Sequence, residues 1–227
     1  MLRRNLLLAA PAVASHAPRR AAAAQVQPVL VELFTSQSCS SCPPADVLLG
    51  ELAGRPDVLA LSYHVTYWNR LGWRDRFSLP EATERQRRYA ATLGHNQIYT
   101  PQTVIQGQRD AVGSNRAAIA AAIRAATPGQ VRLSLREAGP AVSVDAGAGE
   151  GSATFWLIGY DRQHVTPVAG GENRGRTLTH SHVVRSLSPL GEWRGQAMGL
   201  TGTRPAGERV AVLLQAHSGA ILGVTTL

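Results

Sequence analysis

The two cysteines of this chain stand three positions apart, in the segment Cys39-Ser40-Ser41-Cys42, and the 227 residues contain no other cysteine. An apolar run over 29–34 comes directly before this segment, and a second run with the character of a helix, 45–52, follows it. The pattern predicts a strand, a short loop and a helix that begins at the cysteine pair. Such an arrangement is typical of thiol–disulfide redox sites.

The start of a helix favours a reactive cysteine. Its first N–H groups have no partner within the helix and its macrodipole is positive there, so both favour a thiolate over a thiol. We therefore predict that Cys39 is the catalytic nucleophile, electron-rich and open to the solvent. Cys42, one turn further along, is predicted to resolve a mixed disulfide by attacking the same sulfur.

Other interpretations of the cysteine pair stay open. The pair can form a structural disulfide that only staples a turn, or half of a zinc site. A zinc site has less support, because the chain has no second cysteine pair. The candidate histidines, His180 and His182, are separated by a single residue, which is not the spacing of a Cys2His2 zinc site. A third interpretation is a copper(I) carrier in which His64 joins the two soft thiolates. We assign no metal ligands and no cofactor.

The first 24 residues have the pattern of a signal peptide. Arg3 and Arg4 are followed by a short apolar core and by alanines at 22–24. The adjacent arginines also resemble a twin-arginine export signal. The apolar core is too short to span a bilayer, so we expect a periplasmic or secreted protein with no stable membrane insertion after the signal is removed. An oxidising compartment suits a Cys-x-x-Cys pair that cycles.

The net charge of +8 does not indicate a nucleic acid partner. All 23 basic residues are arginine, and four of them lie in the predicted leader, which leaves 19 against 15 acids, or +4. The densest basic cluster, within 85–88, shares a predicted helix with Glu81 and Glu84, as expected for a solvated helix face. We therefore expect protein thiols or disulfides, or a redox partner, and no nucleic acid.

The segment 25–127 is predicted to be an α/β domain with a thioredoxin-like fold. Strand and helix patterns alternate in the order β-α-β-α-β-β-α, which is the minimal thioredoxin order. We expect the last two helices to be capped by Ser78 and Ser114, and Gly94 to end the first of these. The predicted elements are strands at 29–34, 58–65, 99–105 and 111–113 and helices at 43–53, 79–93 and 115–126.

The pattern changes after the Thr-Pro-Gly boundary at 127–129. Segments such as 131–135 and 141–144 alternate between apolar and polar residues, and turn residues interrupt them at short intervals. We therefore predict an all-β, sandwich-like domain over 130–227. A polar motif there, Glu172-Asn173-Arg174-Gly175-Arg176, is expected to form a structural network, or else a contact with a ligand or the other domain.

Seven segments of the chain carry motifs that occur together in one known family: 31–46, 63–68, 71–75, 99–104, 171–178, 182–185 and 190–193. Together they resemble the bacterial domain-of-unknown-function family 1223. This resemblance covers nearly the whole chain after residue 24 and implies a thioredoxin-like first domain and export. The chain departs from the family at Thr66 and Asn69, which replace two acids, so no role of those acids is expected here.

Four residues are assigned to proton transfer and substrate binding beside the cysteines. Glu32 is predicted to lie under Cys42 and to take its proton, the alternative being an outward-facing strand residue. Thr100-Pro101 resembles the cis-proline of thioredoxin folds, which leaves the preceding backbone free to pair with an extended substrate. An ordinary trans proline at the start of an edge strand is the alternative. Tyr99 is expected to flank the groove.

The aromatic residues after the second strand are candidates for a binding rim. Trp68 and Trp73 are predicted to contact substrate, because tryptophan is favoured at binding hot spots, or else to pack as a lid over a small core. The sequence thus predicts an exported thiol–disulfide oxidoreductase that acts on protein thiols. The alternatives are a noncatalytic thioredoxin-like binding module with a structural disulfide and a copper(I) carrier.

Overall fold

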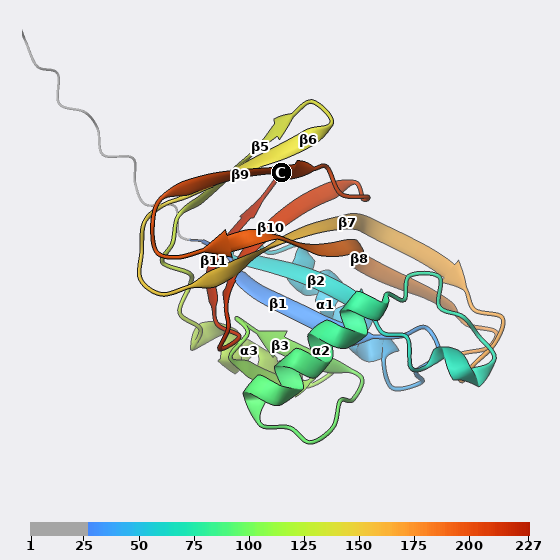
Figure 1. Cartoon of the computed structure of the whole chain (residues 1–227). Coiled ribbons are helices and arrows are strands. Elements are labelled where there is room, and N and C mark those ends of the chain that lie inside the picture. The colour runs from blue at the N-terminus through green and yellow to red at the C-terminus, as the bar shows by residue number, and fades with distance from the viewer. Residues whose placement is uncertain (1–26) are drawn as a thin grey trace, which may run out of the picture.

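The strand before the cysteine pair, β1 (Val29–Thr35), lies inside an eight-stranded sheet and is buried along its whole length. A strand covered on both faces needs a mostly apolar run, which the sequence has here except at Glu32. The computed structural model describes residues 27–227, which form a mixed α/β structure around this sheet (Figure 1). The predicted signal peptide, 1–24, lies outside the described residues.

The N-terminal half follows the predicted order, with one added 3₁₀ turn. β1 pairs in parallel with β2 and antiparallel with β3, and β4 forms the sheet edge. The remaining elements are α1 (Pro43–Ala53), β2 (Val58–His64), η1 (Asn69–Leu71), α2 (Pro80–Leu93), β3 (Gln102–Ile105), β4 (Arg109–Val112) and α3 (Arg116–Arg124).

Of the three residues predicted to cap or end a helix in this half, two are corrected. Helix α2 is preceded by Leu79, and the Ser78 hydroxyl instead donates to the carbonyl of Asp75 at 2.8 Å. The residue that caps α3 is Asn115, whose side chain accepts the N–H of Ala118 at 3.1 Å, rather than Ser114. Gly94 ends α2 in the left-handed conformation, as predicted.

The C-terminal part is mostly β, as predicted, and contains no helix among its described residues. Strands β5, β6 and β9 form a separate three-stranded sheet, which packs on β7, β8 and β10 through a core that contains Phe155 and Trp193. The strands are β5 (Leu133–Ala138), β6 (Ala141–Ala146), β7 (Ala153–Pro167), β8 (Thr177–Trp193), β9 (Met198–Thr203), β10 (Arg209–Ala216) and β11 (Ile221–Thr226).

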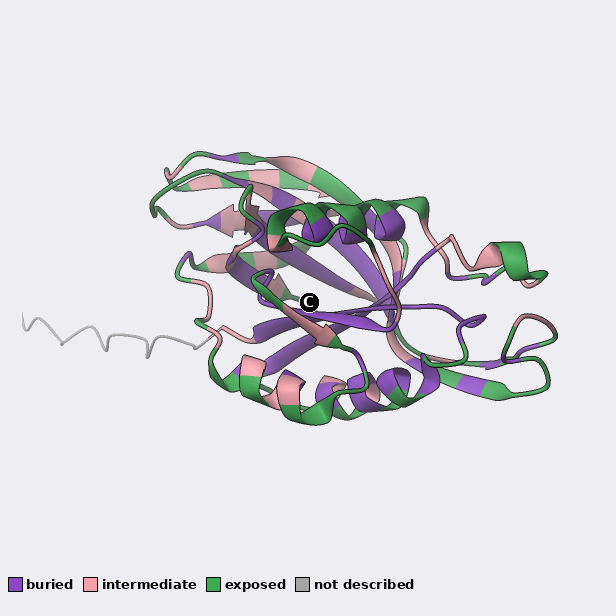
Figure 2. Cartoon of the chain, turned by 90° about the horizontal axis from the view of Figure 1, so that it is seen from below, coloured by how far each residue is buried: buried purple, intermediate pink, exposed green. Residues whose placement is uncertain are grey.

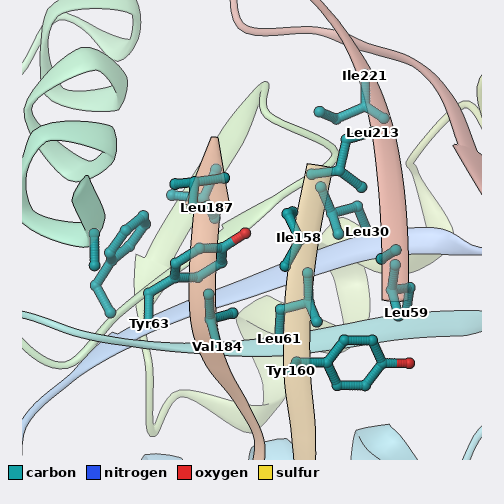
Figure 3. Close-up of a cluster of buried hydrophobic side chains, with 14 of the residues drawn as sticks. Leu30, Leu59, Leu61, Tyr63, Ile158, Tyr160, Val184, Leu187, Leu213 and Ile221 are labelled. Atoms are coloured by element: carbon teal, nitrogen blue, oxygen red, sulfur yellow. The ribbon is translucent and has the colours of Figure 1, made fainter. Parts of the chain in front are cut away.

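The large sheet runs through both halves of the chain. Its strand order is β11-β10-β7-β8-β2-β1-β3-β4, and β8 joins β2 in parallel where Val183 lies opposite Ser62. One apolar cluster contains residues from both halves, among them Leu61 and Ile158 (Figure 3). The predicted boundary at 127–129 therefore lies between α3 and β5, in a chain whose two parts share a sheet and a core.

Helices cover both faces of the N-terminal half of the sheet, with their buried residues turned toward it (Figure 2). Helices α1 and α3 pack on the face that carries Val31 and Leu33, whereas α2 packs on the face that carries Leu30 and Phe34. Neighbouring residues of a strand point to opposite faces, so β1 contributes side chains both to the layer under α1 and α3 and to the layer under α2. None of the helices within 27–227 has the length and apolarity to cross a membrane.

Candidate functional site

The two cysteines form a disulfide at the start of α1, with their Cα atoms 5.4 Å apart. Cys42 occupies the N-cap, and Pro43 and Pro44 open the helix, so the predicted strand, loop and helix are confirmed. Both cysteines are 0% exposed. The prediction that Cys39 is open to the solvent is therefore wrong for this oxidised conformation.

Two hydroxyl groups lie against the Cys39 sulfur. The Ser41 Oγ is 3.3 Å from it, and the Thr100 hydroxyl donates to it at 3.4 Å. The indole N–H of Trp68 in turn donates to the Thr100 Oγ1 at 2.7 Å and fixes that side chain. Ser41 is exposed and Thr100 is half-buried, so one layer of side chains separates the sulfur from solvent at this point.

The segment that carries Thr100 meets the cysteine pair as the sequence predicts. The Thr100–Pro101 peptide bond is cis, and the Pro101 carbonyl accepts the N–H of Gly113 at 2.9 Å. Tyr99 points elsewhere, because its hydroxyl donates to the Asp110 carboxylate at 2.9 Å. Thr100 and Pro101 are thus brought to the site, while the Tyr99 side chain is bound to Asp110 on β4.

Trp73 reaches the loop before the cysteines. Its indole N–H donates to the Gln37 side-chain oxygen at 2.9 Å, and the Ser38 hydroxyl donates to the Trp73 carbonyl at 3.3 Å. Both predicted tryptophans are half-buried and tied by hydrogen bonds to residues that flank the disulfide. The tryptophan loop therefore packs over the cysteine segment and leaves part of each indole at the surface.

The structure corrects the predicted position of Glu32. Its side chain is fully buried on the α2 face of the sheet, whereas α1 and Cys42 lie on the opposite face. Arg85 on α2 binds both carboxylate oxygens, at 2.6 and 3.2 Å, and the Tyr89 hydroxyl also donates to the carboxylate. Burial acts to lower the pKa of Arg85, but the Glu32 charge overcomes it and raises this pKa. Glu32 therefore belongs to a buried ion pair.

The polar motif of the C-terminal part closes over the cysteine segment. The Asn173 amide donates to the carbonyls of Gln37 and Cys39, at 3.0 and 2.8 Å. The Glu172 carboxylate accepts both the N–H and the hydroxyl of Ser40, at 2.9 and 2.7 Å. Gly171 lies so close that a Cβ there would meet the Ser38 hydroxyl at 2.8 Å. The motif is a contact between the two parts of the chain.

A buried polar group that sequence reasoning missed lies on the α1 side of the sheet. We call it the Asp46–His180 cluster, and it consists of Asp46, His64, Asp75 and His180. His64 Nδ1 is 2.7 Å from Asp75 Oδ2, which also accepts the Gln37 N–H, and the His64 and His180 rings are 4.7 Å apart. One available signal was Asp46 itself, an acid between Ala45 and Val47, four positions after Cys42.

The cluster contains charged and neutral members. Burial acts to lower the pKa of His64, but the Asp75 carboxylate overcomes this and raises it. Burial acts to raise the pKa of Asp75, but His64 and the Gln37 and Phe77 N–H groups hold it below its usual value. Burial lowers the pKa of His180 to about 3 and raises that of Asp46 from 3.8 to about 7. His64 and Asp75 are therefore an ion pair beside a neutral His180.

Within 27–227, no group of three His, Cys, Asp or Glu side chains is arranged to hold a metal ion. His64, the predicted third ligand of a copper(I) site, has one ring nitrogen on Asp75. The Nδ1 atom of His64 therefore contacts Asp75, while its Nε2 atom has no hydrogen-bond partner among the described residues.

Comparisons with known proteins place the chain in a family. A family model described as protein of unknown function (DUF1223) matches residues 30–215. The chain belongs to this family. Protein AGR_C_4864 from Agrobacterium tumefaciens, solved by crystallography, is 35% identical, with a TM-score of 0.79 over 89% of this chain and 95% of that one. No curated protein matches the chain.

A second solved structure has the fold at low identity. HBP35 of Porphyromonas gingivalis is 13% identical to this DUF1223 protein, with a TM-score of 0.55 over 89% of this chain and 75% of that one. At this identity the likeness concerns the fold alone.

Proposed function

We propose that this DUF1223 protein is an exported thiol–disulfide oxidoreductase that acts on protein thiols through Cys39 and Cys42. The observation that carries the proposal is the contact of the Thr100 hydroxyl, beside the cis bond to Pro101, with the Cys39 sulfur at 3.4 Å. The disulfide stands at a helix N-terminus, where the macrodipole favours a thiolate. The order β1-α1-β2-α2-β3-β4-α3 supports a thioredoxin-like assignment for this half.

The reaction is an exchange of two electrons and two protons. A thiolate of the partner attacks the Cys39 sulfur, the Cys39–Cys42 bond breaks, and its electron pair goes to Cys42. A second partner thiol then attacks the partner sulfur of the mixed disulfide, and Cys39 leaves as a thiolate. The partner dithiol is oxidised to a disulfide, the protein pair is reduced, and the two protons pass to Cys39 and Cys42. The reverse sequence oxidises the protein.

Access to Cys39 needs only a local change in this proposal. Ser41 is exposed, and exposed side chains change rotamer within nanoseconds. Thr100 must rotate away from its hydrogen bond to Trp68. The backbone around Thr100 then accepts an extended partner strand, and Trp68 and Trp73 form the rim.

A second candidate is a noncatalytic binding module in which the disulfide only staples the loop. The full burial of both cysteines favours it, because attack requires a thiolate to reach a sulfur atom. The anchoring of the Gln37 and Cys39 carbonyls by Asn173 also favours a fixed loop.

Single-cysteine variants separate the two candidates. The full chain with Cys42→Ser, and its matched control Cys39→Ser, are incubated with a short peptide whose one cysteine is activated as a 2-thiopyridyl disulfide. The oxidoreductase proposal predicts a mixed disulfide at Cys39 in the first variant and little reaction at Cys42 in the second. If neither folded variant reacts, the pair is a structural staple and the proposal is wrong.

Export is proposed from the pattern of residues 1–24 alone. N-terminal sequencing of the protein recovered from a bacterial periplasm tests it. The expected mature chain begins near Gln25, and an intact leader in the cytoplasm would contradict export.

A further inference from the structure

We propose that Asp46 is the proton partner of the Cys42 thiol, and that His180 from the C-terminal part positions Asp46 for this role. The inference rests on the proposed thiol–disulfide function and supplies the proton acceptor that Glu32 does not provide. It also gives the C-terminal part a task at the redox site, because β8 carries His180 to the α1 side of the sheet.

The first argument is position. Asp46 follows Cys42 by one helical turn, and its N–H donates to the Cys42 carbonyl at 3.1 Å. Helical side chains point back toward the N-terminus, so residue i+4 covers the turn that contains residue i. The Asp46 carboxylate therefore lies against the turn of Cys42, and both residues are buried.

The second argument is the absence of a hydrogen bond where one is expected. Asp46 is 4% exposed, and within 27–227 neither of its carboxylate oxygens has a hydrogen-bond partner. Leaving a buried polar group unpaired is costly, so a residue of this kind is retained for a reason other than stability. A carboxyl group that must gain and lose a proton cannot be tied to permanent donors.

The third argument is the set of groups around the carboxylate. His180 Nε2 lies 3.6 Å from Asp46 Oδ2, and neither ring nitrogen of His180 has a hydrogen bond among the described residues. Because His180 is neutral, this contact is not an ion pair, and the ring can share the Asp46 proton after a small approach. Thr35 on β1 adds an uncharged hydroxyl beside the carboxylate.

Burial and three neighbouring groups set the proton affinity of Asp46. Burial raises its pKa to about 7, the positive charge of His64 on β2 and the Thr35 hydroxyl on β1 oppose this, and Asp75 from the loop before α2 adds to it. On the far side, His164 of β7 adds a little to the effect of burial on the pKa of His180, and Arg185 of β8 weakly opposes the rise in the pKa of His64. Asp46 thus changes its protonation near neutral pH, where a proton acceptor for a thiol is needed.

The step balances in both directions. When Cys42 resolves a mixed disulfide, the Asp46 carboxylate takes the thiol proton as the Cys42 sulfur attacks Cys39, and the partner leaves as a thiolate. When a partner thiolate opens the Cys39–Cys42 bond, protonated Asp46 returns the proton to the Cys42 sulfur. No additional oxidant, reductant or metal takes part.

The test follows the two thiols separately in the reduced full chain. With 5,5′-dithiobis(2-nitrobenzoate), attack by Cys39 releases the first nitrothiobenzoate and resolution by Cys42 releases the second. Stopped-flow absorbance from pH 5 to pH 9 measures both phases in the wild type, in Asp46→Asn and in His180→Asn. Asp57→Asn is the control, since it makes the same chemical change at an exposed acid.

We expect the wild-type second phase to accelerate as pH rises, with an inflection near pH 7. Asp46→Asn slows this phase by at least tenfold and removes the inflection, His180→Asn moves the inflection, and Asp57→Asn changes neither. A second phase that keeps its rate and pH profile in Asp46→Asn overturns the inference and leaves the proposed function intact. If the folded wild type lacks even the first phase, the proposed function fails and the inference fails with it.

Discussion

Replacement of Asp46 by asparagine is expected to change how stability depends on pH. The folded chain holds the Asp46 proton up to about pH 7, whereas the unfolded chain releases it near the ordinary pKa of 3.8. Between these values the folded state binds more protons, so raising the pH favours unfolding. The contribution of Asp46 to the free energy of unfolding is greatest below pH 4, falls through this window, and is fully lost above pH 7.

The magnitude follows from the difference between the two pKa values. A pKa that moves from 3.8 to about 7 corresponds to about 4 kcal/mol at 1.36 kcal/mol per pH unit. The loss amounts to about 1.4 kcal/mol for each pH unit between pH 4 and pH 7. A typical domain has only about 5–15 kcal/mol in total, so an effect of this size is measurable.

Urea denaturation of the oxidised full chain from pH 4 to pH 8 measures this effect. We expect Asp46→Asn to gain stability relative to the wild type by about 4 kcal/mol across that range, because asparagine does not titrate. The exposed Asp57→Asn serves as control: Arg55 lowers the pKa of Asp57, so its small effect has the opposite sign. Parallel stability curves for the wild type and Asp46→Asn would refute the protonation assigned to Asp46.

Three further substitutions test the contacts around the sheet and the disulfide. Arg85→Met leaves the buried Glu32 carboxylate unpaired and should lower the free energy of unfolding by about 3–5 kcal/mol, whereas adding Glu32→Leu should restore part of it. Asn173→Ala removes the donor from two buried carbonyls, so urea denaturation should show a loss of about 1–3 kcal/mol. Thr100→Ala uncovers the Cys39 sulfur and should speed reduction by dithiothreitol, and an unchanged rate would show that Thr100 does not limit access.

The sequence was sufficient for the features that depend on local chemistry. The helix over 43–53 begins directly after Cys42 because two prolines follow the cysteine loop, and proline is well accommodated in the first turn of a helix. The cis bond before Pro101 was predicted from its resemblance to a known motif and is confirmed. The alternating pattern after residue 130 likewise predicted the mostly β part.

Features that depend on which face of a strand meets which helix were not predictable. Glu32 shares β1 with Leu33, and a shift of one residue exchanges the two faces of the sheet. The backbone course of residues 36–38, between β1 and Cys39, decides which face of the sheet α1 covers. The sequence does not indicate this course. The prediction therefore placed Glu32 beneath Cys42, whereas it points toward α2.

Contacts between distant segments were the second source of error. The hydrogen bonds around Cys39 come from Thr100, from Trp68 through Thr100, and from Asn173, which lie in three other parts of the chain. The pairing of Asp46 with His180 depends on β8 joining β2 in one sheet, although a boundary was predicted between the two parts. A sequence pattern read segment by segment contains no signal for such a pairing.

The most direct test of the central claim is the rate at which dithiothreitol reduces the Cys39–Cys42 disulfide in the folded full chain, measured at increasing urea below the unfolding transition. Exchange at a functional site requires only local movement, so we predict a rate proportional to the dithiothreitol concentration and nearly independent of urea. A rate that saturates with dithiothreitol and rises steeply with urea, in step with global unfolding, would mean that the disulfide reacts only when the protein unfolds and would contradict the account.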